Sequence, residues 1–241
     1  MNLLLDLGNS RVKWGLSDSK AQPLVARGSA AYDAQSLAQL AAAWRGFSLD
    51  HVCYASVVDQ EREQAVLSRL PSIVAPHRFM VSQQFGTLCN AYATPETLGL
   101  DRWAAAIGAW AKVQSACLVI SAGTATTIDV IEASQAGGVY RGGLILPGMD
   151  LMLQSLHQGT ARLPDAQGRY RAPPDVPDNT VDAMASGAVE ATCGAMARMA
   201  ARLPANAPWL LTGGHAPTLQ AALQQRATHV EDLVLDGLAQ I

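Results

Sequence analysis

The sequence predicts an α/β fold built from two similar halves. Two glycine-containing turns share one pattern, Asp6-Leu7-Gly8-Asn9-Ser10 and Ser121-Ala122-Gly123-Thr124-Ala125. Each turn follows a short apolar run and leads into a second one, which is typical of a β-hairpin. Apolar segments of strand length then alternate with longer Ala-rich segments in both halves. The repeated opening therefore predicts a duplicated unit.

The first half begins with a hairpin and a third strand over residues 2–29. The expected elements that follow are a helix over 33–45, a strand over 51–57, a polar helix over 59–70, a strand over 77–82, a loop containing Tyr92 and Pro95, and a helix over 98–114. The Ala-rich composition of the first and last of these helices favours that assignment.

The second half restarts with a hairpin over 117–132 and a strand over 139–146. A helix is expected to begin at Pro147, because proline suits the first turn of a helix. A proline-rich stretch over 163–177 predicts a surface loop that crosses the active cleft. The remaining expected elements are a helix over 181–203, a strand over 209–212, a Gly213-Gly214 turn, a helix from Pro217, and a final short strand and helix.

Composition restricts the class of protein. The chain has 241 residues, of which 49% are hydrophobic and 15% charged, enough for two subdomains with a substantial core. The formal net charge of -3 and the absence of a basic run argue against nucleic acid as a partner. Four cysteines without a C-x-x-C pair predict reduced, buried thiols. With no basic leader and no apolar run of about 20 residues, we expect a cytoplasmic protein without a membrane partner.

The turns suggest anion binding. A tight turn exposes backbone N–H groups, and glycine lets the backbone approach a phosphate closely. Asn9, Ser10, Thr124 and Thr126 add short polar side chains that can donate hydrogen bonds. Paired glycines such as Gly213-Gly214 more often form a plain turn. After two phosphate-type hairpins, however, this pair predicts a site for the flat end of a nucleotide.

This set of three turns resembles the actin, sugar-kinase and Hsp70 superfamily. The resemblance implies a duplicated ribonuclease H-like, actin-like ATPase fold, with two similar α/β subdomains and mixed sheets around a nucleotide cleft. We expect these subdomains at residues 1–114 and 115–241. Such a fold does not define the substrate.

The segment from Asn90 to Arg102 narrows the choice, because it resembles the substrate motif of type III pantothenate kinases. Tyr92 and Gly99-Leu100-Asp101-Arg102 carry that resemblance. Three further blocks agree in the expected order, at 6–13, 142–148 and 179–187. The resemblance covers nearly the whole chain and implies ATP-dependent phosphorylation of pantothenate to 4'-phosphopantothenate, the first step of coenzyme A biosynthesis.

The resemblance also implies roles for individual residues. Asp101 would be the general base, and Asp6 would hold Mg²⁺ directly or through water. The remaining ATP contacts would come from Leu7, Gly8, Asn9, Ser10, Arg11, Val12, Lys13, Thr124, Gly213 and Gly214. The pantothenate contacts would come from Tyr92, Gly99, Leu100, Asp101, Arg102 and Thr180.

The residue types suit this chemistry. Phosphoryl transfer to an alcohol needs alignment of the acceptor, neutralisation of phosphate charge, and a carboxylate to take the hydroxyl proton. Mg²⁺ prefers oxygen ligands such as the carboxylate of Asp6. Asp101 stands near the start of a helix, whose dipole favours the ionised form, and Arg102 could bind the carboxylate of the substrate. Lys13 could reach phosphate.

One position departs from the family pattern. The second phosphate block usually begins with an aspartate that helps to hold a monovalent cation, and this chain has Ser121 there. Loss of that charge should weaken a K⁺ or NH₄⁺ site or shift its ligands to neutral oxygens. The dependence on a monovalent cation is therefore open.

Simpler structural roles exist for each of these residues. Asp6 could cap the hairpin, Asp101 and Arg102 could be surface charges, Tyr92 could pack a loop, Thr180 could be a helix N-cap, Lys13 could be solvated, and His215 could be a turn residue. The family also implies a homodimer, with pantothenate near the interface and Thr180 supplied by the partner. Apolar stretches over 98–114 and 181–203 fit an interface or an internal core equally.

Two other functions remain open. One is a different kinase or phosphatase of the same superfamily, which the segment around Tyr92 disfavours. The other is a nucleotide-binding regulatory or accessory protein without turnover, which the retention of Asp6, Asp101 and Arg102 disfavours.

Overall fold

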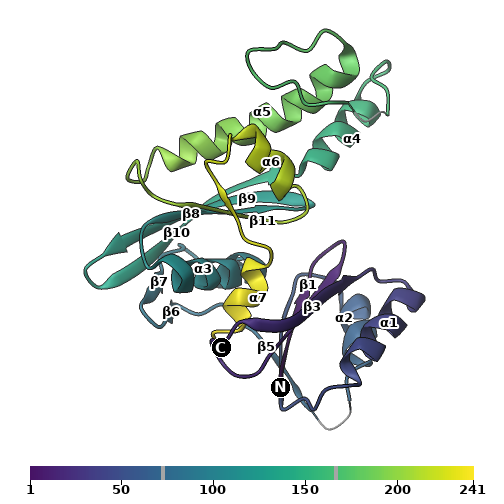
Figure 1. Cartoon of the computed structure of the whole chain (residues 1–241), viewed down its shortest axis with the longest axis vertical. Helices are drawn as coiled ribbons and strands as arrows, with labels where there is room; N and C mark the ends of the chain where they lie inside the picture. Colours follow the sequence, from purple (N-terminus) through teal and green to yellow (C-terminus); the bar gives the residue numbers. More distant parts are fainter. Residues whose placement is uncertain (72–73, 166–167) are drawn as a thin grey trace. The chain divides into compact units, whose positions relative to one another are not determined.

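The computed structural model describes residues 1–71, 74–165 and 168–241. The chain forms two compact units. Unit 1 comprises Met1–Gln114, Ser134–Tyr140 and Asp232–Ile241, and unit 2 comprises Ser115–Ala133 and Arg141–Glu231. The end of the chain thus belongs to the same unit as its beginning (Figure 1). The proposed division into subdomains at 1–114 and 115–241 stays a prediction.

Unit 1 is built on a mixed sheet with the strand order β3-β2-β1-β4-β5. Its strands are β1 (Asn2–Leu7), β2 (Val12–Ser17), β3 (Leu24–Ala30), β4 (His51–Ser56) and β5 (Pro76–Arg78). The pair β1–β2 is antiparallel, as is β2–β3, whereas β4 runs parallel to both β1 and β5. Because side chains alternate along a strand, Leu3, Leu5 and Leu7 enter one core while Leu4 and Asp6 face the other side.

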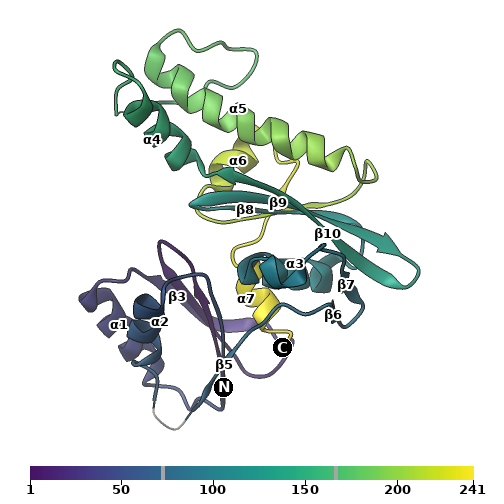
Figure 2. The ribbon, with the colours of Figure 1, turned by 180° about the vertical axis from the view of Figure 1, so that it is seen from behind.

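Helices α1 (Ala34–Trp44) and α2 (Gln60–Leu67) lie together on one face of this sheet (Figure 2). Asp33 and Asp59 cap them, each accepting a hydrogen bond from a backbone N–H three residues later. Leu37, Leu40 and Trp44 of α1 pack on the leucines of β1.

The rest of unit 1 is centred on helix α3 (Leu100–Val113), which is buried at every residue from Arg102 to Ala109. Helix α7 (Leu233–Leu238) packs against it, with Gly108 facing backbone atoms of Leu233 and Gly237. A short hairpin of β6 (Gln84–Phe85) and β7 (Leu88–Asn90) and a 3-10 turn at Pro95–Thr97 precede α3. The apolar stretch of α3 is therefore internal core.

Unit 2 repeats the topology of the unit 1 sheet. Strands β8 (Cys117–Ala122), β9 (Ala125–Ser134), β10 (Gly137–Pro147), β11 (Trp209–Thr212) and β12 (Thr228–His229) follow the order β10-β9-β8-β11-β12. This order matches that of β3-β2-β1-β4-β5, with an antiparallel β8–β9 hairpin and parallel β8–β11 and β11–β12 pairs. The first residues of β10, up to Tyr140, belong to unit 1, where they pair with β7. The predicted duplication is confirmed.

Helices α4 (Met149–Gly159), α5 (Thr180–Ala200) and α6 (Ala216–Ala222) complete unit 2. Their apolar residues, among them Met149, Met196 and Leu219, share a core with Leu118, Ile120 and Leu211 of the sheet. Figure 1 shows α4 and α5 running beside each other.

Several expected boundaries differ from the structure. The strand expected over 77–82 ends at Arg78, and the hairpin of β6 and β7 replaces part of the loop expected around Tyr92. Pro147 is the last residue of β10 instead of a first-turn residue, because Gly148 is the N-cap of α4. In the proline-rich stretch, residues 166–167 lie outside the described residues, and 168–177 contain no helix or strand.

Within the described ranges, no helix combines the length and the apolar character needed to span a bilayer.

Candidate active site

The first turn joins β1 to β2 at Gly8–Arg11 and is held by several hydrogen bonds. The Gly8 N–H donates to the Arg11 carbonyl at 3.1 Å. The Tyr32 hydroxyl donates to the Gly8 carbonyl at 2.8 Å, and Arg62 Nη1 donates to the Asn9 carbonyl at 3.2 Å. Asn9, Ser10 and Arg11 are exposed. The turn is therefore held in place, and three of its residues are accessible from solvent.

Asp6, just before this turn, lies among charged residues of unit 1. It pairs in register with Lys13 across the β1–β2 hairpin, so the two side chains share one face of the sheet. The Lys13 ammonium lies 3.2 Å from Asp232 Oδ1, and Arg27 Nη1 lies 4.0 Å from Asp232 Oδ2. Asp232 directly precedes α7, so the end of the chain delivers a carboxylate to this site.

Burial raises the pKa of Asp6 to about 7. Lys13 lowers this pKa, whereas the negative charges of Asp101 and Asp232 raise it further. When Asp6 is ionised, the positive charge of Lys13 therefore does not offset burial and the two neighbouring carboxylates. A divalent cation would supply the missing positive charge, and a carboxylate oxygen is the ligand type that Mg²⁺ prefers. Of the residues that the structure describes, no three His, Cys, Asp or Glu side chains converge as a complete metal site.

Asp101 stands in the first turn of α3, after the N-cap residue Gly99. Its Oδ1 accepts a hydrogen bond from the Arg102 backbone N–H at 2.9 Å. The side chain is half-buried, and its charge acts on Asp6. Asp6, Asp101, Asp232 and Lys13 therefore belong to one electrostatic cluster.

Arg102 is buried, with 6% of its surface exposed, and is not the surface charge considered as an alternative. Its guanidinium carbon lies 5.6 Å from the centre of the Tyr92 ring, within the range of a cation–π interaction. Tyr92 in turn lies beside Tyr140, whose ring meets Trp103 edge-on at 5.7 Å. The Tyr92 backbone N–H donates to Asn90 Oδ1, which orients the loop. The sequence motif from Tyr92 to Arg102 is thus one contiguous cluster.

The second turn, in unit 2, lies between β8 and β9. The Gly123 N–H donates to the Ala125 carbonyl at 3.0 Å, and the Gly148 N–H donates to the Thr124 carbonyl at 2.9 Å. A Cβ on Gly148 would overlap the carbonyl oxygen of Gly123. The Gly142–Gly148 block therefore lets the start of α4 meet the second turn.

The Gly213–Gly214 turn adjoins the same hairpin. Gly213 has φ +101°, and a Cβ there would overlap the Ala122 carbonyl oxygen, which also accepts a hydrogen bond from the His215 N–H at 3.1 Å. Only glycine fits this position without strain. His215 is the N-cap residue of α6, and its Nε2 lies 3.1 Å from Asp150 Oδ2 of α4.

Ser121 and Thr180 occupy two further places in unit 2. Ser121 is half-buried in β8 and pairs with Thr127 and Thr212. Thr180 is exposed and is the first residue of α5. Asn179 is the N-cap, with its side chain accepting from the Asp182 N–H, so the alternative that Thr180 caps the helix is wrong.

Three aspartates that make ion pairs or hydrogen bonds near the candidate site residues were not expected from the sequence. Asp232 sits 226 positions after Asp6, and no local pattern marks it as a partner of Lys13. Asp150 and Asp182 are also absent from the expected set. The signal that could have found Asp182 is its place three residues after an N-cap asparagine.

The strand order and its repetition define a fold class, the duplicated two-subdomain α/β fold. A solved structure from Campylobacter jejuni, described as a conserved putative Baf family transcriptional activator, aligns with a TM-score of 0.60 at 20% identity and covers 98% of this chain and 94% of that one. A putative 2-dehydro-3-deoxygalactonokinase from Sinorhizobium meliloti aligns with a TM-score of 0.59 at 12% identity, covering 99% and 97%. At these identities, both comparisons support the fold alone.

The family is narrower than the class. Residues 2–202 match the family model for type III pantothenate kinase. The type III pantothenate kinase of Aromatoleum aromaticum is 42% identical, with 99% of this chain and 96% of that protein covered. The enzyme of the same name from Chromobacterium violaceum is 40% identical, with 100% and 99% covered. The chain belongs to the type III pantothenate kinase family.

Proposed function

We propose that this chain transfers the γ-phosphoryl group of ATP to pantothenate, producing 4'-phosphopantothenate for coenzyme A biosynthesis, with Asp101 as the general base. Family membership over the full chain supports the reaction. The observation that carries the assignment of residues is the cluster of Asp101, Arg102 and Tyr92. It combines a half-buried carboxylate with a buried cation on an aromatic ring.

Pantothenate has a carboxylate at one end and a primary hydroxyl at the other. Arg102 is held against Tyr92 and would bind the carboxylate, because a guanidinium matches that group in charge and shape. Gly99 and Leu100 would complete the acceptor site, and Thr180 would be supplied to it by the partner subunit, as the family implies. The carboxylate of Asp101 would take the proton from the attacking hydroxyl, as phosphoryl transfer requires.

The nucleotide would use the two turns and the Gly213–Gly214 pair. The exposed first turn, from Gly8 to Arg11, and Thr124 of the second turn would donate to phosphate oxygens. Gly213 and Gly214 offer backbone without a side chain to the flat end of the nucleotide. Asp6 would hold Mg²⁺, which neutralises phosphate charge when bound, and the anionic surroundings of Asp6 favour that cation.

Lys13 has two candidate anionic partners, Asp232 and a phosphate of ATP. In the structure its ammonium is paired with Asp232, and in the proposed complex it would also reach phosphate. Asp232 would then serve to hold the lysine beside the first turn.

The monovalent cation is a separate part of the proposal. The family aspartate at the start of the second phosphate block is Ser121 here, so this position contributes a neutral hydroxyl. We infer that any K⁺ or NH₄⁺ bound there relies on neutral oxygens and is held weakly. Activity that is equal with K⁺, NH₄⁺ or Na⁺ would support this inference, and a strict K⁺ requirement would contradict it.

We further propose a cytoplasmic homodimer. Leu144 and Ile145 at the end of β10, and Leu151 and Leu156 of α4, are large apolar side chains that are 39–65% exposed. A second copy would cover this surface. Ile145→Asp should shift the mass measured by light scattering from that of a dimer to that of a monomer, and an unchanged mass would contradict the use of this surface.

The proposal is tested by Asp101→Asn, which keeps the shape of the side chain and removes its basicity. We expect kcat to fall by roughly a hundredfold or more, with ATP binding and thermal stability close to those of the wild type. Asp18→Asn, the same change at an exposed residue that directly follows β2, is the control. An unchanged kcat in Asp101→Asn would remove Asp101 from the role of base.

A further inference from the structure

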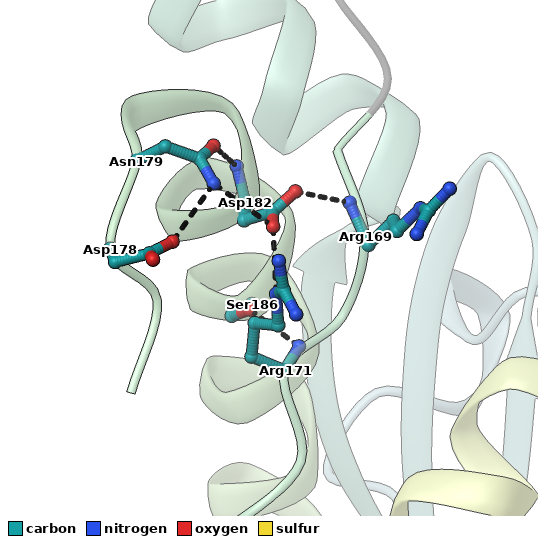
Figure 3. A network of polar contacts seen from close by, with 6 residues as sticks. All are labelled: Arg169, Arg171, Asp178, Asn179, Asp182 and Ser186. Atoms are coloured by element: carbon teal, nitrogen blue, oxygen red, sulfur yellow. Dashed lines mark hydrogen bonds and ion pairs between the residues drawn. The ribbon is translucent and has the colours of Figure 1, made fainter. Parts of the chain in front are cut away.

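A polar network in unit 2 joins the proline-rich stretch to the start of α5 (Figure 3). The segment from Gly168 to Arg171, here called the strap, lies along the first turns of this helix. The Arg169 N–H donates to Asp182 Oδ1 at 2.8 Å, and the Arg171 N–H donates to Ser186 Oγ at 3.0 Å. Two alternate N–H groups of the strap thus meet two successive turns of the helix.

The strap and the helix advance by similar distances between successive contacts, which explains why the contacts continue along α5. Two residues of extended chain advance about 6.6 Å, and four residues of α-helix advance about 6 Å. Residues 169 and 171 can therefore follow residues 182 and 186, which share one face of α5. The Tyr170 hydroxyl continues the pattern one turn later, donating to Glu190 Oε1 at 2.7 Å.

Asp182 is the centre of the network. Its Oδ2 accepts from Arg171 Nε at 2.8 Å and from Asn179 Nδ2 at 3.1 Å, while its own N–H donates to Asn179 Oδ1 at 2.9 Å. The Asp182 side chain is buried, and the hydrogen bonds from the Arg169 N–H, then from Asn179 and Arg171, lower its pKa to about 2. Asp182 therefore hydrogen-bonds both the Nδ2 and the Oδ1 atom of Asn179, the N-cap residue of α5, and fixes the orientation of that side chain.

The network holds both sequence neighbours of Thr180. Asn179, the residue before it, is oriented by Asp182. After it stands Val181, whose carbonyl lies so close to Gly168 that a Cβ on that glycine would overlap it. Thr180 itself remains exposed. The first turn of α5 thus presents Thr180 to solvent from a backbone that is held on either side.

We propose that Asp182 and Arg171 are positioning residues for the kinase reaction, which hold Thr180 in the orientation that meets pantothenate. This inference rests on the proposed contact between Thr180 and pantothenate. Arg171 also neutralises the Asp182 carboxylate, which keeps that side chain in place beside Asn179. Loss of either side chain should weaken the acceptor site and leave the nucleotide site unchanged.

The first test compares Arg171→Met with Glu190→Ala in the full chain. Both remove one contact between the strap and α5, but only Arg171 bears on the turn that holds Thr180. We expect Arg171→Met to raise KM for pantothenate roughly tenfold or more and to leave KM for ATP unchanged. Glu190→Ala should leave both KM values unchanged. An equal rise in both KM values for Arg171→Met, or no rise, would overturn the proposal.

The second test is a double-mutant cycle between Arg171→Met and Thr180→Ala, read as kcat/KM for pantothenate. If Arg171 acts through Thr180, the double variant should be no worse than Thr180→Ala alone. Additive losses would show that Arg171 acts elsewhere and would overturn the positioning role. An unchanged KM in Thr180→Ala would overturn both the Thr180 contact and the positioning role, while the wild-type activity in the same assay would still report on the kinase reaction.

Discussion

Replacement of Asp6 by asparagine should stabilise the ligand-free protein at neutral and alkaline pH. Asp6 is 9% exposed, and its pKa is raised from 3.8 to about 7, first by burial and then by Asp101 and Asp232. An acid whose pKa is higher in the folded than in the unfolded state loses stability as the pH rises between those two values. The wild type should therefore become less stable between about pH 4 and pH 7 because of this group, and remain so above pH 7.

The magnitude follows from the size of the pKa change. A rise from 3.8 to about 7 corresponds to roughly 4 kcal/mol of unfavourable free energy for the ionised carboxylate, at about 1.4 kcal/mol for each pH unit. Asparagine is neutral in both states, so Asp6→Asn should gain up to about 4 kcal/mol in free energy of unfolding at pH 8. At pH 5 the gain should be less than half of that. The same variant should lose most of its kinase activity if Asp6 holds Mg²⁺ as proposed, because asparagine would be a poor replacement for a carboxylate ligand.

The assay is urea unfolding followed by tryptophan fluorescence at pH 5 and pH 8, without nucleotide or divalent cation. Asp18→Asn, the same change at an exposed residue after β2, is the control and should alter stability by less than about 0.5 kcal/mol. A variant of Asp6 that is no more stable than the wild type at pH 8, or whose gain is the same at both pH values, would refute the reasoning.

Three further predictions follow from the same geometry. Gly213→Ala should lower the free energy of unfolding by roughly 1–3 kcal/mol and raise KM for ATP, because φ +101° and the Ala122 carbonyl leave no room for a Cβ. Gly159→Ala is the control, since nothing lies near the Cβ position of that glycine, and equal thermal unfolding of both variants would count against this explanation. Tyr92→Ala should raise KM for pantothenate tenfold or more while Tyr92→Phe stays near the wild-type value, since the ring face is what meets Arg102; a Phe variant as impaired as the Ala variant would point to the hydroxyl instead. Asp182→Asn should lower stability above about pH 4 and approach the wild type as the pH falls toward 2, because the pKa of this carboxyl is depressed in the folded state; a pH-independent difference in urea midpoint would contradict that cause.

Local pattern was enough to predict the repeated sheets. Each hairpin carries its own turn, and each strand its own apolar run, so β1–β2 and β8–β9 were expected close to where they occur. The short strands β6 and β7 were missed, because segments of two or three residues carry no periodicity and depend on pairing with β10. Pro147 was misplaced because Gly148, which has to approach the second turn closely, begins the helix instead.

The candidate site was predictable only where its residues are neighbours in sequence. Tyr92, Asp101 and Arg102 lie within one segment, and the fold places the Arg102 guanidinium over the Tyr92 ring. The partnership of Lys13 with Asp232 depends on the return of the chain to unit 1, and that of Arg171 with Asp182 depends on a strap without regular structure. Long-range charge pairs of this kind leave no periodic signal in the sequence.

The most direct test of the central claim is mass-spectrometric detection of 4'-phosphopantothenate after purified protein is incubated with ATP, Mg²⁺ and pantothenate. Wild type and Asp101→Asn should be compared with K⁺, NH₄⁺ and Na⁺ in turn. We expect product from the wild type and at least a hundredfold less from Asp101→Asn. Absence of product from folded wild-type protein under every salt would contradict the assignment as a pantothenate kinase, and equal product from both proteins would contradict Asp101 as its base.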